Sequence, residues 1–228
     1  LLRARLRTLY ETTDCKGELA VMLLEDAEAT GDGTERVALL QRAARLYLDL
    51  GDTESALGPL GAASELSPED METQLLVVDI AIQRGQLADA QQRLEAAIVV
   101  QRKRRSPELA LLYQRMGRLA AAQGDVEEQL KWLNQAMEID RRSGELAAEL
   151  AEAAMAAESY DTAMKALRAI TMMEEPHPMS RATAFLKQAQ IAFVRGDPRR
   201  AQHWARKAKS LDENMPEIDA FLAQIEGS

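Results

Sequence analysis

Two amphipathic segments joined by a short turn recur along the whole sequence, and this recurrence is the strongest constraint on the fold. In the clearest copy, residues 37–70, a turn at Gly51 separates the two segments. Small residues stand where two helices would touch: Ala44, Ala56 and Ala63. The copies begin 34 to 39 residues apart, at Leu1, Val37, Met71, Ala110, Gly144 and Ala182. Such a helix pair cannot cover its own apolar face, so the period predicts an all-α solenoid in which neighbouring pairs pack together.

Composition agrees with closely packed helices. Apolar residues make up 46% of the chain, aromatic residues only 4%, and the net charge is −9. Apolar content dominated by Ala and Leu favours helices over a sheet. The negative charge disfavours sequence-independent binding to nucleic acid. No apolar run approaches the roughly 18 residues of a membrane span, so we expect none.

The copies resemble the repeats of the tetratricopeptide repeat (TPR) family, whose unit is about 34 residues long. The residues that carry the resemblance are Ala44, Tyr47, Gly51, Ala56, Leu60, Ala63 and Pro68 in one copy, and Gly117, Gly124, Asp125, Trp132, Leu133, Ala136, Ile139 and Asp140 in another. The resemblance covers essentially the whole chain and implies a bacterial-type, right-handed superhelix that forms one domain, residues 1–228. Its repeats would be 1–36, 37–70, 71–104, 110–143, 144–177 and 182–215, followed by a capping helix at 216–226.

Local signals place several element boundaries. Ser67-Pro68, Ser106-Pro107 and Asp197-Pro198 each combine a capping residue with a proline, which predicts that a helix starts there. Two prolines within residues 174–180 predict a long loop between repeats. Glu158 stands at a turn where most copies carry glycine.

No residue pattern indicates catalysis. His177 and His203 have no cysteine or patterned carboxylate at metal-ligand spacing, and each glycine of a turn stands outside any phosphate-binding loop. Cys15, the single cysteine, leaves no partner for an intrachain disulfide. The sequence therefore predicts a non-enzymatic protein without a metal or cofactor.

The resemblance implies that the first helices of the repeats line a concave groove and contact ligands. At positions 5, 6 and 9 of the repeats, the polar candidates are Gln41, Arg42, Arg45, Asp79, Gln114, Arg115, Arg118, Glu149, Glu152, Lys187 and Gln190. The motif Gln-Arg-x-x-Arg occurs twice among them. Because a guanidinium binds a carboxylate through two parallel hydrogen bonds, Arg42, Arg45, Arg115 and Arg118 are the preferred contacts for a peptide partner, which would be acidic. The alternative is a solvated helix surface.

Charge is unevenly distributed along the chain. Residues 144–177 carry seven acids against two bases, whereas residues 181–211 carry eight bases against one acid. The two segments either neutralise each other as neighbours or form a patch for an acidic partner. The basic run Arg102–Arg105 is interpreted as cations at a helix C-terminus rather than a nucleic-acid site.

These features predict a protein–protein interaction scaffold that binds a peptide or a partner helix in the groove. Two alternatives remain open at this level: a sensor or regulatory segment of a larger multidomain bacterial protein, and a self-assembling structural spacer. The sequence begins at Leu1 within a helical pattern, which we interpret as a fragment of a longer chain, with the cytoplasm slightly favoured as its location.

Overall fold

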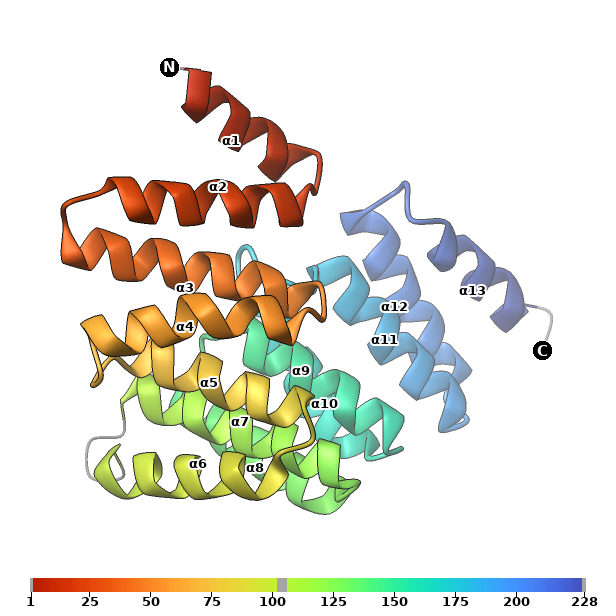
Figure 1. Ribbon diagram of the computed structural model, residues 1–228. Coiled ribbons are helices and arrows are strands. Elements are labelled where there is room, and N and C mark those ends of the chain that lie inside the picture. The colour runs from red at the N-terminus through yellow and green to blue at the C-terminus, as the bar shows by residue number, and fades with distance from the viewer. Residues whose placement is uncertain (1, 102–105, 227–228) are drawn as a thin grey trace. The chain divides into compact units, whose positions relative to one another are not determined.

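The computed structural model describes residues 2–101 and 106–226, and these residues form thirteen α-helices and no strand (Figure 1). The chain divides into two compact units, Leu1–Arg102 and Lys103–Ser228. The prediction of a single continuous domain stays a prediction, and each unit is described by itself. The run Arg102–Arg105 lies outside the described residues.

The first unit contains three helix pairs. They are α1 (Leu2–Thr12) with α2 (Lys16–Ala29), α3 (Gly33–Asp49) with α4 (Thr53–Leu66), and α5 (Met71–Gln83) with α6 (Leu87–Gln101). Consecutive helices pack against each other, and the first helices α3 and α5 also touch. Ala44 and Ala56 are completely buried beside Leu60, which shows why small residues recur here: they let two helix backbones approach closely.

The second unit contains three further pairs and a last helix. They are α7 (Pro107–Gln123) with α8 (Val126–Ile139), α9 (Gly144–Ala156) with α10 (Tyr160–Thr171), α11 (Arg181–Val194) with α12 (Pro198–Leu211), and finally α13 (Pro216–Glu226). A cluster of buried apolar residues in this unit includes Leu133, Leu167 and Ile170. Helix α13 covers α12 through Ile218 and Phe221, and the Phe221 ring meets Phe193 edge-on at 5.8 Å. The predicted capping helix is confirmed.

The turn inside each helix pair places one residue in the left-handed backbone region. Four of these residues are glycines with φ between 72° and 79°, namely Gly51, Gly85, Gly124 and Gly196. The other two are Asp14 and Glu158, both at φ 54°. The same hydrogen bonds close the turn with or without glycine: Ser159 N–H donates to the Ala154 carbonyl at 2.8 Å, as Asp52 N–H does to the Tyr47 carbonyl at 2.9 Å. The structural period therefore matches the sequence period.

Replacing Glu158 with glycine should stabilise the protein by about 0.5–1 kcal/mol. The left-handed conformation costs a residue with a Cβ about 1–2 kcal/mol, and the greater freedom of unfolded glycine offsets part of that gain. Urea unfolding followed by circular dichroism measures the change. Glu158→Ala is the control, because it removes the carboxylate and keeps the Cβ. An equal gain in both variants would assign the effect to the charge.

The boundary between α4 and α5 differs from the prediction. Ser67 does not start a helix: it ends α4, and its N–H donates to the Ala63 carbonyl at 2.9 Å. Helix α5 starts at Met71, after Asp70 accepts a hydrogen bond from the Thr73 N–H at 2.8 Å. Residues 67–70 form the turn between the two helices, so Asp70 and not Ser67 caps the N-terminus of α5. The starts predicted at Ser106-Pro107 and Asp197-Pro198 are confirmed.

Aspartates cap other helices in the same way. Asp52, before α4, accepts a hydrogen bond from the Ser55 N–H at 3.0 Å. Hydrogen bonds from the side chain and then the backbone of Ser55 hold the pKa of Asp52 below the ordinary aspartate value. The charged form, which is the better acceptor for a helix N-terminus, is therefore favoured.

The predicted loop at 174–180 is present between α10 and α11. Its backbone lies against the start of α9, where a Cβ added to Gly144 would stand 2.5 Å from the His177 carbonyl oxygen. His177 thus lies in a loop that packs on its own unit, and Gly144 provides the space for it.

Candidate functional site

In the first unit, the predicted groove residue Gln41 is buried between repeats. Its side chain is only 6% exposed, and its amide donates to the Asp70 carboxylate and, at 2.9 Å, to the Thr73 hydroxyl. Asp70 and Thr73 belong to the start of the next first helix, α5. Gln41 therefore ties α3 to α5.

The neighbouring arginines lie at the surface. Arg42 forms an ion pair with Glu11 of α1, and Arg45 forms one with Glu72 of α5 at 2.6 Å. The side chains of Arg42 and Arg45 are 45% and 56% exposed, and their partners are 39% and 47% exposed. Pairs this accessible to water contribute about 0–1 kcal/mol each. The two guanidinium groups are consequently held only weakly.

In the second unit, the same motif forms a tighter cluster around Glu149. The carboxylate of Glu149 accepts hydrogen bonds from Arg118 at 2.9 and 2.8 Å and from the Gln114 amide at 2.5 Å. Gln114 is 1% exposed, and its carbonyl accepts a hydrogen bond from Arg115 at 3.0 Å. This cluster links α7 to α9 and leaves Arg118 only 36% exposed.

The same pattern of ion pairs between consecutive repeats occurs in both units. Arg45 and Arg118 each stand at position 9 of a repeat, and each pairs with the glutamate at position 2 of the following repeat. The distances are 2.6 Å to Glu72 and 3.5 Å to Glu145. Sequence reasoning missed these glutamates, although an acid 27 residues after each arginine was the available signal. Glu149 adds the second acceptor, where the equivalent position in the first unit holds the buried Leu76.

The four remaining predicted residues also lie on first helices, and none of them is among the partners named above. Asp79 is half-buried on α5 and has a polar partner. Glu152 is exposed on α9, and Lys187 and Gln190 are half-buried on α11. The structure therefore brings together Gln114, Arg118 and Glu149.

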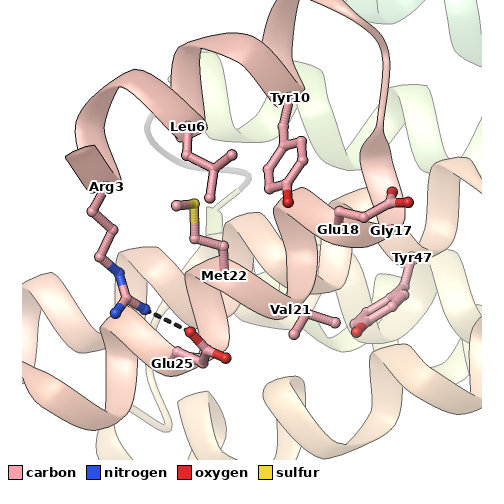
Figure 2. A pocket seen from close by; sticks show the side chains of 9 residues that line it. All are labelled: Arg3, Leu6, Tyr10, Gly17, Glu18, Val21, Met22, Glu25 and Tyr47. Atoms are coloured by element: carbon pink, nitrogen blue, oxygen red, sulfur yellow. Dashed lines mark hydrogen bonds and ion pairs between the residues drawn. The ribbon is translucent and has the colours of Figure 1, made fainter.

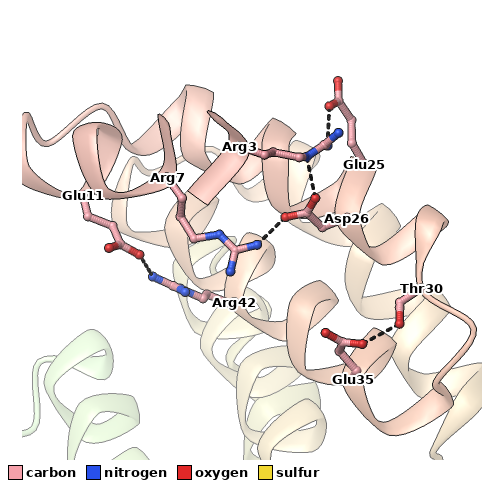
Figure 3. A network of polar contacts seen from close by, with 8 residues as sticks. All are labelled: Arg3, Arg7, Glu11, Glu25, Asp26, Thr30, Glu35 and Arg42. Carbon is pink, nitrogen blue, oxygen red and sulfur yellow. Dashed lines mark hydrogen bonds and ion pairs between the residues drawn. The ribbon is translucent and has the colours of Figure 1, made fainter. Parts of the chain in front are cut away.

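Ion pairs join α1 to α2 and to α3 at the N-terminal end of the first unit (Figure 3). Arg3 pairs with Glu25 at 2.8 Å and with Asp26 at 2.7 Å, and Arg7 also pairs with Asp26. These contacts tie α1 to α2, while Arg42 reaches α1 from α3. Much of the attachment of α1 is thus ionic and weakens with salt.

An open pocket of about 670 Å³ lies between α1 and α2 (Figure 2). Leu6, Val21 and Met22 form its apolar part, Tyr10 and Tyr47 close one end, and the Arg3–Glu25 ion pair stands at the other. Leu6 and Val21 are 38% and 50% exposed. The pocket therefore combines an exposed apolar surface with one ion pair.

Within residues 2–101 and 106–226, no group of three or more His, Cys, Asp and Glu side chains is placed to hold a metal ion. None of the helices in this part of the chain has the length and apolar character needed to cross a membrane.

Comparisons with known proteins agree with this architecture. Residues 110–143 match a family model described as tetratricopeptide repeat. Functionally curated proteins give no match. Similar solved structures include a tetratricopeptide repeat protein from Parabacteroides merdae ATCC 43184, with 20% identity over 99% of this chain and 83% of that chain and a TM-score of 0.58. PilW, a type IV pilus biogenesis factor, has 14% identity over 97% of each chain and a TM-score of 0.65. YrrB, a TPR protein with an unusual peptide-binding site, has 16% identity over 83% of this chain and 91% of its own, with a TM-score of 0.53.

Repeated helix pairs with matching turns and repeat-to-repeat polar contacts define an all-α solenoid protein. One repeat, residues 110–143, is thus matched as a tetratricopeptide repeat, and the chain shares its fold with solved tetratricopeptide repeat proteins.

Proposed function

We propose that the chain is a non-enzymatic scaffold that binds an extended peptide or a partner helix along the first helices of its repeats, with Arg42 and Arg45 as the principal contacts. The observation that carries this proposal is the exposure of both guanidinium groups and of the carboxylates paired with them. An acidic side chain of a partner replaces Glu11 or Glu72 at little cost, because each exposed pair is worth about 0–1 kcal/mol.

The two copies of the motif differ in their role. In the second unit, the bidentate contact with Glu149 and the burial of Gln114 commit Arg118 to holding α7 against α9. Gln41 and Gln114 are likewise left out of the proposed contact surface, since both are buried. Peptide binding is known for the structurally similar YrrB, and here it supports the class of ligand alone.

The double variant Arg42→Ala/Arg45→Ala should bind peptides about tenfold more weakly than the wild type, because the two lost contacts between exposed charges are together worth about 1–2 kcal/mol. Peptides selected by display on the wild-type protein serve as probes, and fluorescence anisotropy measures their affinity. Far-ultraviolet circular dichroism should show unchanged helical content.

The matched control is Arg84→Ala/Arg93→Ala. These two arginines also belong to the first unit and each pairs with a carboxylate, Glu54 at 3.0 Å and Asp89 at 2.8 Å, but they lie at the α5–α6 turn and on the second helix α6. The control should retain wild-type affinity. Equal losses in both double variants would mean that net charge alone governs binding, and unchanged affinity in the first would remove Arg42 and Arg45 from the site.

A further inference from the structure

A second pocket, of about 680 Å³, lies in the second unit between α10 and α12, and its walls are basic. Lys165 and Arg168 follow each other along one face of α10, and Arg200 faces the pocket from α12. Arg195, just after α11, completes the basic lining. Four cations thus surround one cavity in a protein whose net charge is −9.

The two acids that line the pocket are already engaged. Asp161 pairs with Arg195 at 2.8 Å. Asp197 caps α12 by accepting a hydrogen bond from the Arg200 N–H at 3.0 Å. Arg168 forms no ion pair or hydrogen bond through its guanidinium with any residue in the described part of the chain, and the Arg200 side chain reaches Asp197 only at 3.8 Å. Lys165 pairs with Glu138 at 3.6 Å and donates to the Asn134 side-chain oxygen at 2.9 Å, so the uncompensated positive charge of the pocket comes from Arg168 and the loosely paired Arg200.

The ion pairs of the second unit test the first explanation of the uneven charge, neutralisation between neighbouring repeats. If α11 and α12 neutralised α9 and α10, several ion pairs would join them. Among the described residues, the Arg195–Asp161 pair is the one such bridge, and Lys209 pairs instead with Asp219 of α13. Further bases along the exposed side of α12 extend the basic surface away from the pocket: Arg199, Arg206 and Lys207. Neighbour neutralisation accounts for little of this charge.

The floor of the pocket is apolar. Met164 and Ile191 are 7% and 2% exposed and contribute to the core below. Trp204 forms part of the wall, and the Arg200 guanidinium stands 5.6 Å from the centre of its ring. A cation held against an aromatic face keeps its orientation while its outer side remains available to an anion. The combination suits a carboxylate next to an apolar side chain.

We propose that the α10–α12 pocket binds an acidic peptide segment of a partner protein, with Arg168 and Arg200 holding a carboxylate and Trp204 packing against an adjacent apolar side chain. The proposal goes beyond the first-helix site, because it assigns a second surface on the second helices α10 and α12. Failure of either proposal would leave the other unaffected, because they concern different residues.

Short fluorescein-labelled peptides in which Asp and Glu alternate with Leu and Phe test this assignment. The wild-type protein should bind them more tightly than the same peptides carrying Asn and Gln, and the affinity should fall with salt. Arg168→Gln/Arg200→Gln should weaken binding about tenfold. Asp161→Asn should strengthen it about threefold, because it frees Arg195 from an acid whose side chain is 92% exposed.

Two controls make the result decisive. Arg84→Ala/Arg93→Ala removes the same charge from the first unit and should leave this affinity unchanged, as should Arg42→Ala/Arg45→Ala. Equal weakening by either control, or no preference for acidic over amide peptides, would overturn the proposal. Tighter binding of labelled oligothymidylate than of the acidic peptides would also overturn it and assign the surface to nucleic acid. Circular dichroism of each variant verifies the fold.

Discussion

Replacing Glu149 with alanine should lower the free energy of unfolding by about 2 kcal/mol, the largest effect expected of any single carboxylate in the described clusters. The substitution removes the acceptor of both Arg118 hydrogen bonds and the close acceptor of the Gln114 amide, which keeps only the long 3.4 Å contact with Glu145. A buried polar group left without its partner costs about 1–3 kcal/mol. The Gln114 side chain, at 1% exposure, has little access to water as a substitute, whereas the partly exposed Arg118 adds less. Urea unfolding followed by circular dichroism measures the loss.

Glu72→Ala is the matched control in the first unit. Glu72 also joins consecutive first helices, but it is 47% exposed and accepts from an arginine that is 56% exposed. The expected loss is below about 1 kcal/mol. Similar losses for Glu72→Ala and Glu149→Ala would contradict the conclusion that burial separates a structural cluster from an exchangeable ion pair.

Replacing Gly117 with alanine should destabilise the protein by about 1–2 kcal/mol, even though alanine is the better helix former. A Cβ on Gly117 would stand 2.9 Å from Cγ of Leu133, whose side chain is completely buried in α8. Forcing an extra methyl group into a filled core costs about 1–3 kcal/mol, of which the helix propensity of alanine returns about 0.5–1 kcal/mol. Thermal and urea unfolding both report the change.

Gly61→Ala is the matched control, and here the same substitution should stabilise the protein. Gly61 is exposed on α4, and a Cβ there would meet no atom within 4 Å. This variant should gain about 0.5–1 kcal/mol from helix propensity. A loss at both glycines would show that Gly117 is not distinguished by the close approach of α7 and α8.

Much of the architecture follows from patterns that are local in the sequence. Ala44, Ala56 and Ala63 repeat because helix backbones that approach closely leave room only for small side chains, and all three are completely buried. Turn glycines repeat because the left-handed conformation is open to them. Glu158 shows the limit of this reasoning: the turn forms without glycine, since the hydrogen bonds that close it come from the backbone.

Boundaries and side-chain roles were less predictable. Ser67 and Asp70 both have capping side chains, and only the path of the chain between α4 and α5 selects the aspartate. The motif Gln-Arg-x-x-Arg predicted equivalent contacts from two repeats in one groove. Its two copies differ because residue 76 is a leucine and residue 149 a glutamate, and these positions belong to the next repeat.

The sequence by itself determined the helix pairs, their period and the kind of residue at each contact, because these depend on interactions between residues close in the chain. Only the tertiary structure decided which charges are bound within the protein and which remain available to a partner. That distinction depends on distances between side chains about 30 residues apart and on their access to water. It separates Arg118, committed to Glu149, from Arg168, whose charge faces an open pocket.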